Sequence, residues 1–191
     1  MSTANPVEAR DSIRSPWASL IPLCLAVTLY KLDTTIVNVA LPSIQQDLNT
    51  SQEATVWTVS SYILALTMSI PLAGALGDRL GRRRVFVFGM VLFGLFSGAC
   101  AFAPSDLWLI IFRFCQGAAA GVLIPLSMAI VGASFRGHDL TTAYGLWSGT
   151  SSIGFVIGPL IGGVLVKQVG WQSVFWVNVP LSLLLVPLTY W

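Results

Sequence analysis

Six long apolar segments restrict the folds that this chain can adopt. Each is close to the ~20 residues that a helix needs to cross the hydrocarbon core of a bilayer. The segments are residues 17–41, 54–77, 84–103, 107–135, 141–166 and 171–191. Charged residues make up only 9% of the 191 residues and fall almost entirely between these segments. The pattern predicts an all-α integral membrane protein with six transmembrane helices, because helices satisfy their own backbone groups in lipid.

The basic residues predict an orientation. If the N-terminus is cytoplasmic, the cytoplasmic side holds Arg10, Arg14, Arg79, Arg82, Arg83, Arg84 and Arg136. The other side holds Lys167 alone, and cytoplasmic loops are the ones enriched in Lys and Arg. We therefore expect residues 1–16 to be a cytoplasmic segment, without the features of a cleaved signal peptide. Residues 17–191 would then form one six-helix transmembrane domain in the plasma (inner) membrane.

Two ionisable residues, Asp33 and Arg113, lie inside predicted spans. A charge at that depth costs at least ~2.5–3.5 kcal/mol, so such residues are rare and usually functional. At ~1.5 Å per residue, Asp33 lies about 12 Å and Arg113 about 9 Å below the same predicted edge of the membrane. Geometry therefore allows an ion pair. It would be either a proton-linked carboxylate tuned by a guanidinium, or a structural link between two helices.

Small residues on the fourth and fifth spans predict close helix contacts. On the fourth span, one stripe holds Arg113, Gln116, Gly117, Ala120 and Gly121, and Pro125 interrupts the helix. The fifth span has Gly154, Gly158 and Gly162 spaced four apart, with Pro159 and Gly163 beside them. Glycine removes the side chain, so another helix backbone can approach closely, and proline bends the helix.

A short polar loop joins the second and third spans. It contains Gly74, Asp78, Arg79, Gly81, Arg82 and Arg83. Gly81 allows a sharp reversal, and Asp78 is expected to accept hydrogen bonds from the first amides of the next helix. The arginines would either bind lipid phosphates or a facing helix end, or only fix the topology.

Other chemistries find little support in the sequence. The three cysteines, Cys24, Cys100 and Cys115, lie in apolar segments without CxxC spacing, so we expect no metal site. A net charge of +2 gives no indication of nucleic-acid binding. No nucleophile–base spacing stands out, and His138 is expected to be a solvated loop residue, so we do not expect an enzyme.

Together these motifs resemble the N-terminal half of a major facilitator superfamily transporter, over essentially the whole chain. The loop from Gly74 to Arg83 resembles motif A of that superfamily, Arg113 to Gly117 resembles motif B, and Gly154 to Gly163 resembles motif C, the antiporter motif. The segment from Leu32 to Pro42 resembles the first helix of drug:proton antiporters with fourteen spans, the EmrB/QacA type. The resemblance implies two inverted three-helix repeats, in which spans one and four are equivalent.

The resemblance also implies a function, which is proton-coupled efflux of small, multidrug-type substrates. The proton gradient would supply the energy without a cofactor. Proton coupling and transport would involve Asp33, Arg113, Asn38, Gln116 and Lys31. Motif A would latch the inward-closed state, and motif C would control helix bending.

Partners implied by the resemblance are the lipid bilayer, a small-molecule substrate, and a missing C-terminal half or partner chain. The last follows because alternating access needs two halves and the chain ends directly after its sixth span. We therefore expect a fragment or a truncated form. The alternatives are an uptake facilitator for a nutrient and a truncated membrane protein that transports nothing.

Lys31 departs from that family pattern. It stands two residues from Asp33, so it lies roughly on the opposite side of the helix, and its own face continues through Thr35 and Asn38. Either this face lines the pathway while Asp33 packs against another helix, or the reverse holds. A third option is that Lys31 snorkels to the membrane surface. A fixed cation beside the cavity would oppose cationic substrates and favour anionic or neutral ones.

Overall fold

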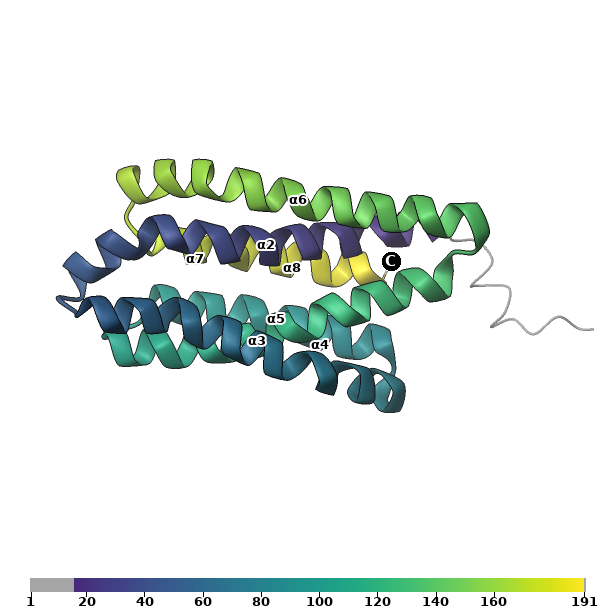
Figure 1. Ribbon diagram of the computed structural model, residues 1–191, viewed down its shortest axis with the longest axis horizontal. Coiled ribbons are helices and arrows are strands. Elements are labelled where there is room, and N and C mark those ends of the chain that lie inside the picture. Colours follow the sequence, from purple (N-terminus) through teal and green to yellow (C-terminus); the bar gives the residue numbers. More distant parts are fainter. Residues whose placement is uncertain (1–15, 191) are drawn as a thin grey trace, which may run out of the picture.

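The computed structural model describes residues 16–190, and this part of the chain contains helices and no strands. In chain order the helices are α2 (Pro16–Asp47), α3 (Gln52–Leu80), α4 (Arg82–Ala101), α5 (Asp106–Ser134), α6 (Gly137–Gln168), α7 (Ser173–Trp176) and α8 (Asn178–Tyr190). They run side by side along the long axis of the molecule (Figure 1). Apart from Pro16, the predicted cytoplasmic segment 1–16 lies outside the described residues.

Five of the described helices, α2 to α6, are long and apolar enough to cross a membrane. The sixth predicted span, over residues 171–191, is an apolar helical segment over Ser173–Thr189 that is shorter than the other five and locally interrupted. That region forms the four-residue helix α7 and the 13-residue helix α8, with Val177 between them. Pro180 explains the interruption, since it has no N–H to donate to the carbonyl of Trp176 four residues earlier.

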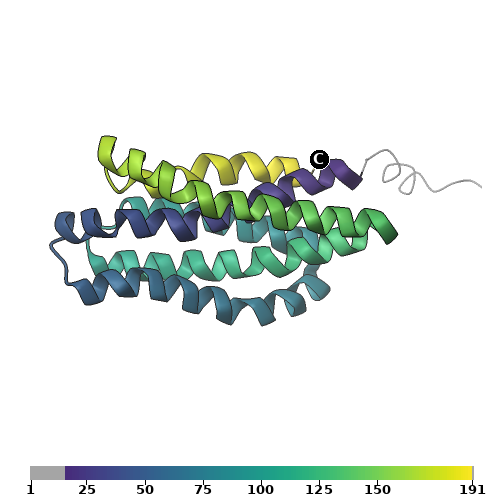
Figure 2. The same ribbon diagram turned by 45° about the horizontal axis from the view of Figure 1, so that its top comes forward.

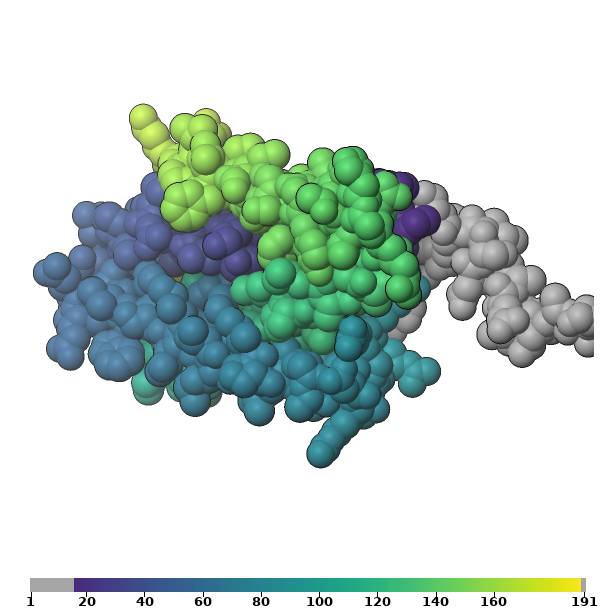
Figure 3. All heavy atoms as spheres, turned by 45° about the vertical axis from the view of Figure 1, so that its right-hand side comes forward, coloured from purple at the N-terminus to yellow at the C-terminus, as the bar shows by residue number. Residues whose placement is uncertain are grey.

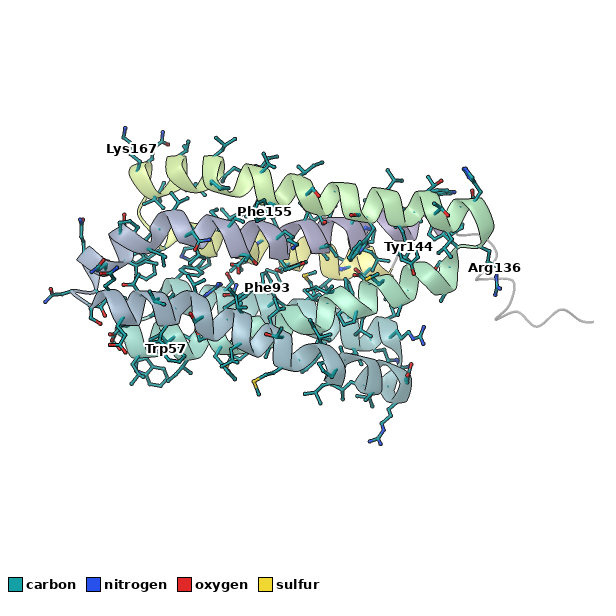
Figure 4. All side chains as sticks on the ribbon, in the orientation of Figure 1. Trp57, Phe93, Arg136, Tyr144, Phe155 and Lys167 are labelled. Atoms are coloured by element: carbon teal, nitrogen blue, oxygen red, sulfur yellow. The ribbon has the colours of Figure 1, made fainter. Side chains whose placement is uncertain are left out.

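The two ends of the bundle differ in charge, as the sequence predicts. Figure 1 shows the α3–α4 and α5–α6 connections at one end, and the α2–α3, α4–α5 and α6–α7 connections at the other. Arg136 and Lys167 lie at opposite ends (Figure 4). The Arg136 end also holds the arginines of the α3–α4 connection.

The packing partners follow the pattern of two inverted repeats. Helix α2 packs mainly on α6, and α3 packs mainly on α5, while α4 contacts α5 and α8. When spans one to three are matched with spans four to six, α2 corresponds to α5 and α3 corresponds to α6. The α2–α6 contact then corresponds to the α5–α3 contact. The two views in Figures 1 and 2 agree on this arrangement, with α6 along α2 and α5 along α3.

The glycines of α6 allow its close contact with α2. A Cβ atom at Gly154 would collide with the carbonyl of Thr28, one at Gly158 with Thr35, and one at Gly162 with Ile36. Thr28 Oγ1 also donates a hydrogen bond of 2.9 Å to the carbonyl of Thr150. The predicted tight contact is confirmed. Gly163 takes no part in it, because a Cβ there would meet nothing within 4 Å.

A second glycine contact joins α5 to α3. A Cβ at Gly117 would collide with the backbone of Tyr62, and one at Gly121 with the backbone of Leu66. Ala120, between them on the predicted stripe, is fully buried. The stripe therefore packs against a neighbouring backbone, as the sequence predicts.

Two buried apolar clusters fill the bundle, one toward each end. On α2, the first cluster runs from Leu20 to Tyr30 and the second from Leu32 to Ile44. Polar side chains gather where the clusters meet. Large apolar side chains cover the outer surface as well, among them Leu64, Phe88, Leu95, Leu160 and Leu183. An apolar exterior of this kind is suited to lipid.

The glycine contact predicts an asymmetric response to mutation on α6. Gly154→Ala should destabilise the purified protein by about 1–3 kcal/mol, because the added methyl group overpacks against the Thr28 carbonyl. Gly163→Ala is the matched control and should unfold like the wild type. Thermal unfolding in detergent measures both, and equal stabilities would contradict the packing described.

Candidate functional site

An ion pair lies at the centre of the bundle. Arg113 Nη1 on α5 is 2.8 Å from Asp33 Oδ2 on α2, and the two side chains are 1% and 0% exposed. The sequence allowed this pair by depth without establishing it. The described structure brings the two charges into direct contact, away from lipid and water.

Two amide side chains complete the binding of the Asp33 carboxylate. Its Oδ1 accepts hydrogen bonds from Gln116 Nε2 at 3.1 Å and from Asn178 Nδ2 at 2.7 Å. Gln116 Oε1 in turn accepts from Arg113 Nη1 at 2.9 Å. Each carboxylate oxygen therefore has a donor, which is what a buried anion requires.

Helix α4 holds Asn178 in place through Ser97. Asn178 Nδ2 donates to Ser97 Oγ at 3.0 Å, and Ser97 Oγ donates to the carbonyl of Phe175 at 2.8 Å. Phe175 and Asn178, which both belong to the α7–α8 segment, are buried. The interrupted sixth span thus brings a polar side chain to Asp33 and ties it to α4.

The Arg113 guanidinium is also enclosed by aromatic rings. Its Cζ atom lies 3.9 Å from the ring centre of Tyr62 on α3 and 5.8 Å from that of Phe175. Its Nε donates to the carbonyl of Thr58 at 3.4 Å. Cation–π contacts stabilise a desolvated guanidinium. Contacts from α2, α3, α4, α5 and the α7–α8 segment therefore hold Asp33 and Arg113 in place.

One polar atom in this site has an unused bonding capacity. Asn178 Oδ1 is buried and has no hydrogen-bond partner among the described residues. An amide oxygen accepts hydrogen bonds, and a protonated carboxyl group can donate one. The site therefore contains an acceptor next to Asp33 that the ionised form of Asp33 does not use.

Sequence reasoning missed several members of this site. They are Thr58, Tyr62, Ser97, Phe175 and Asn178. An asparagine inside an apolar segment was the available signal for Asn178, because an amide in lipid needs a partner within the bundle. The carbonyl and ring contacts depend on the rotation of each helix, which hydropathy does not fix.

The structure separates the residues predicted to share a face with Lys31. Thr35 is buried against Gly158 of α6, whereas Lys31 is half-buried and Asn38 is exposed. Asp33 packs inward against other helices, as in the alternative in which the Lys31 face lines the pathway. The open face is made of Lys31, Thr34 and Asn38, so the expected Lys31–Thr35–Asn38 face is wrong at Thr35.

The motif A residues lie at the end of α3 and the start of α4, at the same end of the bundle as Arg136 (Figures 1 and 4). Asp78 Oδ1 pairs with Arg82 Nη2 at 3.1 Å, and both side chains are exposed. The expected bonds from Asp78 to the first amides of α4 are absent among the described residues, so that prediction is wrong. Gly81 has φ +94°, which favours glycine and allows the reversal between α3 and α4.

Other members of motif A are open to the surroundings. Gly74, Arg79 and Arg83 are exposed. Arg82 Nη1 also lies 3.5 Å from the carbonyl of Ala129 on α5. This contact links the loop to the end of α5, close to Ser134 where that helix ends.

Comparisons with known proteins identify the family to which this fold belongs. The family model described as Major Facilitator Superfamily matches residues 23–191. The chain therefore belongs to the major facilitator superfamily, whose members are transporters rather than enzymes. The solved structure of the proton:xylose symporter XylE has the same fold with a TM-score of 0.81 at 17% identity, over 92% of this chain and 44% of that chain.

Curated relatives carry names from drug resistance. The chain is 39% identical over 168 residues to the tetracenomycin C resistance and export protein of Streptomyces glaucescens, covering 88% of this chain and 31% of that protein. It is 40% identical over 177 residues to the multidrug resistance protein Stp of Mycobacterium tuberculosis, covering 92% and 33%. The chain thus spans about a third of the length of these relatives.

The ion pair predicts a characteristic mutational cycle. Arg113→Met should cost roughly 3–5 kcal/mol of stability, because it leaves a buried carboxylate without its counter-charge. The double variant Asp33→Leu/Arg113→Met should recover part of that loss, since it leaves no unpaired charge. Arg136→Met, at an exposed arginine, is the control. Thermal unfolding measures these three variants together with the single variant Asp33→Leu, and a double variant that loses the sum of both single effects would contradict a direct pair.

Proposed function

We propose that this chain is the N-terminal half of a proton-coupled exporter of small organic molecules, and that Asp33 carries the exchanged proton. The observation that carries the proposal is the fully buried Asp33 carboxylate, paired with Arg113 between two equivalent helices of an inverted repeat. The resistance and export names of the relatives support the direction of transport. The whole transporter would have fourteen spans, a cytoplasmic N-terminus, and a place in the plasma membrane.

In the described state the Asp33 carboxyl group acts only as a hydrogen-bond acceptor. Asp33 accepts from three donors, one on Oδ2 and two on Oδ1. A protonated carboxyl group must also donate a hydrogen bond, and none of these three donors can accept it, so its O–H needs a new acceptor. Proton binding therefore changes the contacts that hold α2 to α5 and to α8.

Asn178 offers the simplest new partner for the proton. If its amide group turns over, Oδ1 replaces Nδ2 beside Asp33 and can accept the new O–H hydrogen bond. Arg113 then faces a neutral group, and a buried cation without its counter-charge is costly. This cost would drive Arg113 toward water or the substrate, and so couple the proton to a change in the bundle.

Movement of the two halves would complete the transport cycle. A central site would alternate between the two sides of the membrane as the halves rock against each other. The α3–α4 connection with Gly74, Asp78, Arg79, Gly81, Arg82 and Arg83 would latch one state. The α2–α6 contact with Gly154, Gly158, Pro159, Gly162 and Gly163 would set how far α6 can bend. The proton gradient would supply the energy.

The experiment is Asp33→Asn in the full-length transporter. We expect substrate-driven proton release by the purified protein, and proton-driven efflux in proteoliposomes, to fall to background, because asparagine cannot carry the proton. Asp139→Asn, at an exposed acid in the first turn of α6, is the matched control and should behave like the wild type. Unchanged proton release in a folded Asp33→Asn protein would refute the assignment.

A further inference from the structure

Lys31 occupies an unusual position for an ionised side chain. It stands 15 residues from Pro16 and 16 residues from Asp47, at the middle of α2. At ~1.5 Å per residue, Lys31 lies about 15 Å from the predicted span end at residue 41 and about 21 Å from the one at residue 17. A lysine side chain is far too short to snorkel over that distance. Its ammonium group must therefore meet water or a polar partner at mid-depth.

The described part of the chain provides no counter-charge for Lys31. No carboxylate lies within 4 Å of its Nζ, and the neighbouring Tyr30 ring is 5.4 Å away. Asp33 points inward and is neutralised by Arg113. The remaining acidic residues of residues 16–190 lie at or near helix ends: Asp47, Glu53, Asp78, Asp106 and Asp139. The accessible mid-depth surface of these helices is therefore positively charged.

Polar groups accompany Lys31 on the same strip of α2. Thr34 and Asn38 follow it at three and seven residues, and Asn38 is exposed. Asn38 Nδ2 donates to the carbonyl of Thr34 at 3.2 Å, and this leaves its amide oxygen and one N–H open. Figure 3 shows that a strip of α2 remains visible between α6 and α3. The strip can therefore offer one cation and several hydrogen-bonding groups.

An exposed aromatic side chain lies at the same depth. Gly154 meets α2 at Thr28, and Gly158 meets it at Leu32 and Thr35, so Phe155 lies at the level of Lys31. Phe155 is 58% exposed, and Figure 4 places it where α6 adjoins α2. A ring at this level offers apolar contact area to a ligand that also reaches Lys31.

We propose that the α2 strip of Lys31, Thr34 and Asn38 binds the transported substrate, and that the substrate is an organic anion with an apolar or aromatic body. The inference rests on the proposed export function. A single positive charge on a partly apolar face attracts anions and repels cations. Within residues 16–190, Asp33 is the acidic group at this depth, and it is already paired, so it gives cations no compensating attraction.

Direct binding of a fluorescent anion tests the proposal. Fluorescein is the anionic probe, ethidium is the cationic one, and each is titrated into the purified full-length transporter. We expect saturable fluorescein binding that Lys31→Gln weakens about tenfold or more, through loss of one charge-assisted contact. Lys31→Arg should retain binding, and Lys31→Glu should exchange the preference toward ethidium. Lys167→Gln, at the end of α6, is the matched control.

Two results would overturn the proposal. One is a wild-type protein that shows no saturable fluorescein binding. The other is a Lys31→Gln protein with wild-type fluorescein affinity and a wild-type unfolding temperature. If either occurs while Asp33→Asn still abolishes proton release, the export function stands and only the anion site falls. If Lys31→Gln loses fluorescein but Asp33→Asn releases protons normally, the site stands and the proton mechanism falls.

Discussion

The buried ion pair between Asp33 and Arg113 is the constraint on which the rest of the structure depends. Two charges without water are tolerated only when each is paired and hydrogen-bonded. Gln116 and Asn178 meet that requirement at Asp33, while the Tyr62 ring and the Thr58 carbonyl meet it at Arg113. Providing hydrogen-bond and charge partners for these two side chains therefore fixes the relative rotation of nearly every helix in the bundle.

Close backbone contacts make this arrangement reachable. The glycines of α6 bring it against α2, and those of α5 bring it against α3, so the interior has no room for long side chains at these seams. The apolar clusters on either side of the polar layer keep water from the pair. Protonation of Asp33 would act on a tightly packed unit, and its effect would reach several helices at once.

Much of the fold could be predicted from the sequence, because hydropathy and charge position report directly on membrane crossing. Five spans and the depth match between Asp33 and Arg113 followed from spacing alone. The interruption of the sixth span and the role of Asn178 did not, since they depend on Pro180 and on contacts between distant segments. The sequence also does not determine the outward face of α2, because Lys31, Thr34 and Thr35 are all polar and only packing against Gly158 decides which of them is covered.

Infrared difference spectroscopy on the full-length transporter tests the central claim most directly. Spectra recorded at high and low pH reveal a buried carboxylic acid by its carbonyl stretching band. The account predicts one such band that grows as pH falls and disappears in Asp33→Asn, while Asp139→Asn leaves it unchanged. A spectrum without this band across the pH range in which transport runs, or with a band that survives Asp33→Asn, would contradict Asp33 as the proton carrier.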